Sequence, residues 1–160
     1  MNEQRRLSIA ALGLAAGIAI FGELAFAQAG AKPQSQETVV DGVTAEIAEA
    51  VRKEGVLTLK VRYRNTGSAP AKVKIYSGSG DTGRYYVTAG STKFLMLKDS
   101  KGSPLSVQYD THGNLGAEIK PNGSYLFWAK YPAPPADAKK VNFYNPHTPP
   151  FEDVPITEAK

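Results

Sequence analysis

The sequence predicts an all-β fold, an antiparallel β-sandwich of about seven to nine strands. Apolar and polar residues alternate with a period of two, most clearly from Val56 to Arg64, which favours strands over helices. Clusters of Gly, Asn, Asp and Pro separate these segments at short intervals. No convincing amphipathic helix is found from residue 28 onward. At this chain length, an immunoglobulin-like sandwich fits best.

The expected strands can be placed in order along the chain. The first carries Val43, Ala45 and Ile47 on one face, and a turn at 53–55 leads into 56–64. Trp128 is expected in the core with Leu126 on its face, since the strand around it is rich in aromatic residues. Further strands are expected at 72–76, 84–88, 92–98, 105–109, 116–120, 124–130 and 141–144.

A proline-rich block, YPAPPAD (131–137), interrupts the last two expected strands. It could be a ligand segment, a linker between domains or a corner of one fold. Proline cannot donate to a strand ladder, and it holds the preceding residue extended. Strand character resumes at once in VNFY (141–144), so a stiff corner is favoured.

The N-terminus is typical of a cleavable signal peptide over 1–27. Arg5 and Arg6 precede an apolar run of about 15 residues, short of the roughly 20 that span a bilayer. Small residues at 25 and 27 predict cleavage before Gln28. The general secretory route is favoured over twin-arginine export, and residues 28–37 are expected to form a disordered leader.

Composition excludes several classes of protein. The chain has no cysteine, so disulfide scaffolds, thiol catalysis, thiolate metal sites and lipid attachment through cysteine are excluded. Its net charge of +4 is too mild to imply nucleic acid as a partner. One domain over 38–158 is expected, without a membrane-spanning segment after cleavage.

The C-terminal third also resembles a known family. LFWAKYPAPPADAKKVNFY and TPPFEDVPI are similar to the closing segments of small exported bacterial immunoglobulin-like domains, found alone or beside OmpA-like, peptidoglycan-binding domains. NTG (65–67) and LKDSKG (97–102) resemble that pattern too. The resemblance implies an immunoglobulin-like fold in the periplasm or outside the cell. It implies no catalytic motif.

A basic stripe is the first candidate binding site. If 56–64 and 71–76 pair as a hairpin, five basic side chains share one sheet face, with Glu46 available to offset them. The tyrosines near them could add flat contact surfaces. The candidate binding residues are Lys60, Arg62, Arg64, Lys72, Lys74, Tyr76 and Tyr131.

Catalytic and metal sites are less favoured. His112 and Asp110 could serve a small metal-dependent or hydrolytic protein, but no nucleophile motif accompanies them. Asp81 and Asp99 stand among glycines and leave a loop calcium site open. We therefore expect no enzyme activity, no cofactor and no metal. The favoured function is binding of an envelope protein or anionic envelope polymer through a sheet face, and neither the ligand nor the oligomeric state follows from the sequence.

Overall fold

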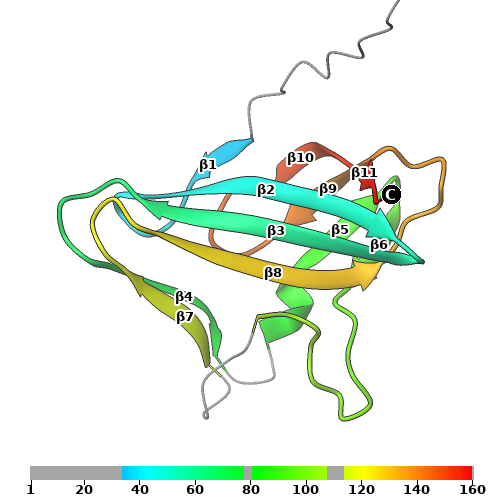
Figure 1. The fold of residues 1–160 in the computed structure, drawn as a ribbon, viewed down its shortest axis with the longest axis horizontal. Helices are drawn as coiled ribbons and strands as arrows, with labels where there is room; N and C mark the ends of the chain where they lie inside the picture. Colours follow the sequence, from blue (N-terminus) through cyan, green and yellow to red (C-terminus); the bar gives the residue numbers. More distant parts are fainter. Residues whose placement is uncertain (1–33, 78–80, 108–113, 160) are drawn as a thin grey trace, which may run out of the picture. The chain divides into compact units, whose positions relative to one another are not determined.

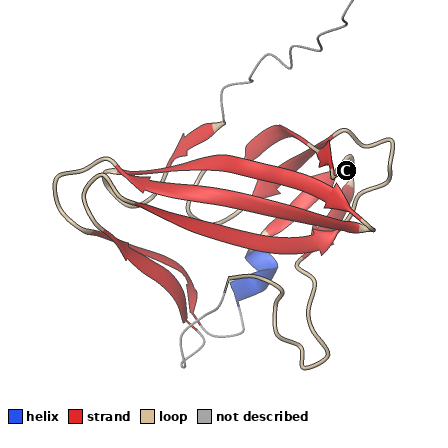
Figure 2. Cartoon of the chain, viewed as in Figure 1, coloured by secondary structure: helices blue, strands red, loops and turns tan. Residues whose placement is uncertain are grey.

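The computed structural model describes residues 34–77, 81–107 and 114–159, which belong to one compact unit over 32–160. The predicted signal peptide lies outside the described residues, as does the predicted leader up to residue 33. Figure 2 shows that strands dominate the described part, and its only helix is one short 3₁₀ turn, η1 (Asp81–Arg84). The predicted all-β class is confirmed.

The first sheet has the strand order β1-β2-β3-β8, and β11 joins β2 on the same edge as a parallel neighbour (Figure 1). The other pairs are antiparallel. Its strands are β1 (Ser35–Glu37), β2 (Val43–Lys53), β3 (Val56–Asn65), β8 (Ser124–Pro132) and β11 (Thr157–Glu158).

The second sheet has the order β10-β9-β5-β6, and β4 pairs with β7 in a separate two-stranded ribbon. All of these pairs are antiparallel. Their bounds are β4 (Ala71–Ser77), β5 (Tyr86–Ala89), β6 (Thr92–Leu95), β7 (Asn114–Ile119), β9 (Lys140–Tyr144) and β10 (Phe151–Pro155).

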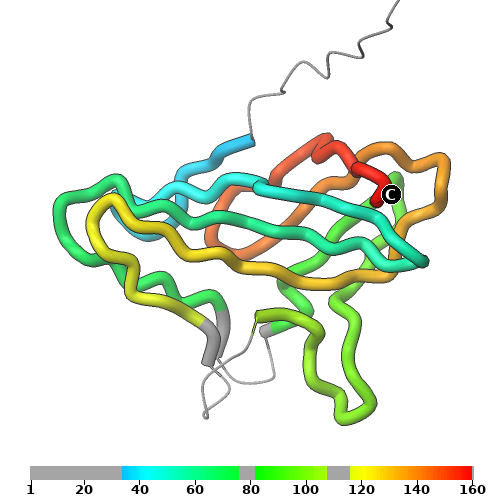
Figure 3. The backbone as a smooth tube through the Cα atoms, viewed as in Figure 1, coloured from blue at the N-terminus to red at the C-terminus, as the bar shows by residue number. Residues whose placement is uncertain are grey.

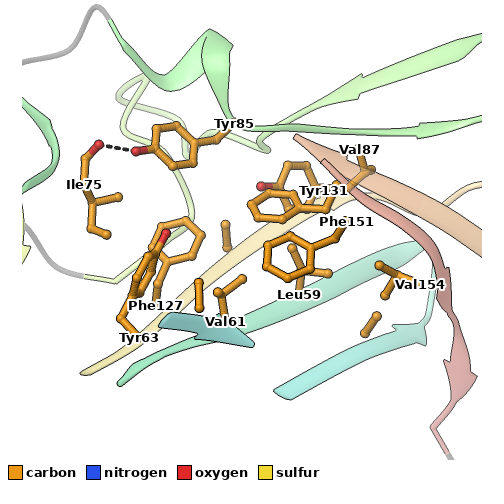
Figure 4. Close-up of a cluster of buried hydrophobic side chains, with 14 of the residues drawn as sticks. Leu59, Val61, Tyr63, Ile75, Tyr85, Val87, Phe127, Tyr131, Phe151 and Val154 are labelled. Atoms are coloured by element: carbon orange, nitrogen blue, oxygen red, sulfur yellow. Dashed lines mark hydrogen bonds between the residues drawn. The ribbon is translucent and has the colours of Figure 1, made fainter. Parts of the chain in front are cut away.

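The inner faces of the two sheets share one hydrophobic core, which makes the fold a sandwich. Tyr85 bridges the layers, with its ring centroid 5.7 Å from that of Phe127 (Figure 4). The alternation in β3 predicts its inward set correctly, because every second residue there is buried. The largest fully buried side chains include Leu57, Leu59, Val61, Tyr63, Phe127, Tyr131, Phe143 and Phe151.

The proline block is a corner of the fold, as predicted. It carries the chain from β8 in the first sheet to β9 in the second, as the tube in Figure 3 shows. The predicted turn before β3 is also confirmed. Glu54 and Gly55 both have positive φ (50° and 78°), as the common two-residue hairpin loop requires.

Three expectations about strands need correction. Residues 105–107 make one isolated bridge to β8, between Ser106 and Ala129, rather than a strand, and Tyr109 lies outside the described residues. Ser35–Glu37, expected in the disordered leader, pairs with β2. The sequence reading also missed β10 and β11, because neither has the alternation of a half-buried strand.

Candidate functional site

Three residues of the predicted basic stripe lie on the outer face of the first sheet. Lys60, Arg62 and Arg64 alternate with the inward residues of β3, and their side chains are 35%, 41% and 50% exposed. Two glutamates on the neighbouring strand β2 balance them in part. Lys60 Nζ lies 2.6 Å from Glu49 Oε2, and Arg62 Nη1 lies 2.7 Å from Glu46 Oε1. The expectation that Glu46 offsets the stripe is confirmed.

Trp128 and Leu126 lie on this same outer face, so the prediction that Trp128 belongs to the core is wrong. The register sets Trp128 opposite Lys60 and Leu126 opposite Arg62. Phe127 pairs with Val61, and both are fully buried. The residues of β8 that face the core are therefore those on the face opposite to Trp128. Leu126 remains 42% exposed, which is unusual for a large apolar side chain in mid-strand.

We call this surface the docking face, and it combines apolar side chains with positive charge. Its basic side chains outnumber its acidic ones. Glu46 is shared between Arg62, at 2.7 Å, and Arg64, at 3.9 Å, and Lys130 adds a further exposed positive charge. Tryptophan and arginine are the residues most enriched at binding hot spots. The docking face consists of Thr58, Lys60, Arg62, Arg64, Leu126, Trp128, Lys130, Glu46 and Glu49.

The remaining residues of the predicted site do not join the docking face. Lys72 and Lys74 lie on β4, which pairs with β7 and not with β3, so the predicted hairpin does not form. Tyr131 is fully buried in the core and cannot contact a ligand on the surface. For Tyr76 only the backbone, in β4, is described.

A second aromatic cluster lies on the second sheet. Tyr86 and Tyr144 stack with ring centroids 4.7 Å apart, and Lys93 Nζ sits 3.6 Å from the centre of the Tyr86 ring. A ring face that is already stacked or covered by a cation is not open to a sugar or a base. These aromatic faces are therefore largely engaged within the protein.

The alternative site cannot be built from the described residues. Asp110 and His112 lie outside them, and no group of three or more His, Asp or Glu side chains that could hold a metal occurs within them. Asp99 Oδ1 accepts hydrogen bonds from the Lys101 and Ser103 amides, each at 2.8 Å, so it shapes its own turn. The side chain of Asp81 is not described.

One shallow pocket of about 520 Å³ lies between the β5–β6 turn and residues 133–139, which join β8 to β9 and which we call the proline-containing connection. Among the described residues that line it, Asp137 is the single carboxylate. Hydrolysis of a glycoside needs two placed carboxyl groups, so this lining does not suit it. The lining residues are Ala89, Gly90, Thr92, Pro135, Asp137, Ala138, Lys139 and Lys140.

A buried arginine is the feature that the sequence reading missed. Arg52 is only 8% exposed, and its guanidinium donates to the Glu158 carboxylate and to the backbone of the proline-containing connection. The Arg52 guanidinium, chiefly through this hydrogen bond, lowers the pKa of Glu158. The pair thus stabilises the fold above the ordinary glutamate pKa, and this contribution is lost as pH falls through the lowered value. The carbonyl acceptors are those of Pro134, Pro135, Ala136 and Ala138.

Two buried tyrosines differ in how their hydroxyl groups are paired. Tyr85 donates to the Ile75 carbonyl (Figure 4), and its oxygen lies 2.8 Å from His147 Nε2. The Tyr63 hydroxyl has no hydrogen-bond partner within the described residues, and burial raises the pKa of Tyr63. A buried polar group without a partner costs stability, whereas a paired one contributes to it.

Phenylalanine at these two positions should therefore shift stability in opposite directions. Tyr63→Phe is expected to raise the free energy of unfolding by about 1 kcal/mol, and Tyr85→Phe to lower it by about 1–2 kcal/mol. Denaturant unfolding of the two variants checks both values. A loss of stability in Tyr63→Phe as large as that in Tyr85→Phe would contradict this assignment.

Comparison with known proteins adds no relative: no family model, no curated protein and no solved structure matches the chain. Within the described residues, no helix is both long enough and apolar enough to cross a membrane.

Proposed function

We propose that this protein is an exported, non-catalytic domain of immunoglobulin-like type that binds an envelope protein or an anionic envelope polymer through the docking face. The observation that carries the proposal is the placement of Trp128 and Leu126 directly beside Lys60 and Arg62 on an outer sheet face. Apolar side chains on β8 with basic side chains beside them on β3 suit a partner that combines an apolar contact with acidic groups.

The setting of this binding is the periplasm or the cell exterior. The N-terminal pattern of basic residues, apolar run and small-residue cleavage site supports it. The absence of cysteine means that no disulfide is needed for stability outside the cytoplasm. The sandwich architecture agrees with an immunoglobulin-like type.

Affinity capture from an envelope extract tests the proposal. Relative to the wild type, Trp128→Ala and Arg62→Glu should each reduce the captured partner at least about tenfold, as expected for hot-spot residues. Raising the salt concentration should weaken capture, because the docking face carries surplus positive charge.

Matched variants on the second sheet serve as controls. Leu95→Ala removes an apolar side chain that is 50% exposed, and Lys140→Glu reverses a charge that is 59% exposed. Both should capture as much partner as the wild type. If Trp128→Ala and Arg62→Glu behave like these controls, the docking face is not the binding surface.

A further inference from the structure

The outer edge of β2 is covered at one end by the very short strand β11. Only two residue pairs form, Thr157 with Val51 and Glu158 with Arg52, and they run parallel. Ala159 adds one backbone hydrogen bond to the Arg52 carbonyl, at 3.0 Å. Both β11 residues are exposed, so the strand buries little of its own surface.

The fold itself limits β11 to this length. β10 belongs to the second sheet, and Ile156 alone separates it from β11. The Ile156 amide bonds the Lys139 carbonyl at 2.9 Å, which directs the chain away from β2 just before the ladder begins. A separate peptide would not be tied to β10, so it could extend the ladder over residues 48–50 of β2, between the positions that β11 covers and those at 44–46 that β1 covers.

The Arg52 guanidinium is fixed in an orientation that binds a carboxylate at this edge. Four carbonyls of the proline-containing connection fix its two terminal nitrogens, and prolines stiffen that connection. Its Nε and one terminal nitrogen face Glu158, at 3.0 and 2.5 Å. Within the described chain, Glu158 is the one carboxylate that hydrogen-bonds Arg52, and its side chain is 57% exposed.

We propose that the β2 edge and Arg52 form a second binding site, independent of the docking face, for an extended peptide that carries a glutamate or aspartate. The peptide adds to β2 as a parallel strand and sets its carboxylate on the Arg52 guanidinium. The chain's own segment 157–159 occupies this site as a tethered occupant. Strand addition supplies affinity through the backbone, and a fixed guanidinium selects the carboxylate.

A labelled peptide added to the full chain tests this site. The probe is Thr-Val-Thr-Ile-Thr-Glu-Ala, and its control has glutamine in place of glutamate. Glu158→Gln weakens the tethered occupant, which otherwise competes at high effective concentration. This variant should bind the glutamate probe at least tenfold more tightly than the wild type does, measured by fluorescence anisotropy. The glutamine probe should bind it at least tenfold more weakly.

Hydrogen exchange gives a second readout. In Glu158→Gln, the glutamate probe should abolish exchange protection at the Ala159 amide and leave β3 unchanged. Equal affinities of the two probes, or no gain over the wild type, would overturn the proposal. Loss of cooperative unfolding in Glu158→Gln would overturn it too, because β11 would then be an integral part of the fold.

Discussion

Replacing Arg52 with methionine is expected to lower the free energy of unfolding by about 3 kcal/mol. Methionine keeps much of the apolar volume but donates no hydrogen bond. The carbonyls of the proline-containing connection then lose their charged donor, and the connection between the two sheets loosens. Denaturant unfolding followed by tryptophan fluorescence measures the change.

Two further variants separate geometry from charge. Arg52→Lys keeps the charge but lacks the planar fork, so it should recover only part of the loss. Arg64→Met removes an arginine from the outer face of the same sheet, where the side chain is 50% exposed, and should cost less than about 0.5 kcal/mol. Equal losses at positions 52 and 64 would show that Arg52 has no special structural role.

Asn65→Ala should lower the free energy of unfolding by about 2–3 kcal/mol. Asn65 is 1% exposed, and its amide donates to the Ala69 and Ile119 carbonyls at 2.8 and 2.9 Å. Its Oδ1 accepts from the Gly67 amide at 2.9 Å. Its side chain therefore shapes the NTG turn and ties the end of β3 to the end of β7.

The neighbouring threonine provides the control for this turn. Thr66 Oγ1 donates to the Gly42 carbonyl at 3.1 Å, but the side chain is exposed. Thr66→Ala should therefore change stability by less than about 0.5 kcal/mol. Thermal unfolding of both variants makes the comparison, and similar midpoints for the two would contradict the role assigned to Asn65.

The sequence predicts β3 well and β8 only in part. In β3 the large apolar side chains alternate with polar ones and therefore share one face, so the inward residues follow directly from a period of two. In β8 both faces are apolar, and only the pairing of Phe127 with Val61 decides that Trp128 faces outward. Pairing of distant strands is a tertiary property that a local pattern does not contain.

A β-bulge in β2 explains why the sequence pattern does not predict that Arg52 is buried. Before the irregularity between Ile47 and Glu49, the inward residues of β2 are Val43 and Ala45; after it, they are Ala50 and Arg52. A bulge inserts one residue and reverses the phase of the strand. Simple alternation through β2 would instead direct Arg52 toward solvent.

The prediction of the basic stripe is correct for the residues of β3 and wrong for those of β4, for a related reason. Lys60, Arg62 and Arg64 share a face because they lie on one strand, but the inclusion of Lys72 and Lys74 assumed a hairpin. After the NTG turn the chain does not return along β3; β8 takes the position beside it instead. Charge on a neighbouring segment of sequence does not establish charge on a neighbouring strand.

Site-specific photocrosslinking in the native envelope tests the central claim most directly. A photoreactive residue at position 58 lies on the docking face, where Thr58 pairs with Lys130 and Val51. The matched position is 88, where Thr88 pairs with Lys93 and Asn142 on the second sheet. We predict a partner adduct from position 58 and none from position 88. An adduct from position 88 alone, or equal adducts from both, would contradict binding through the docking face.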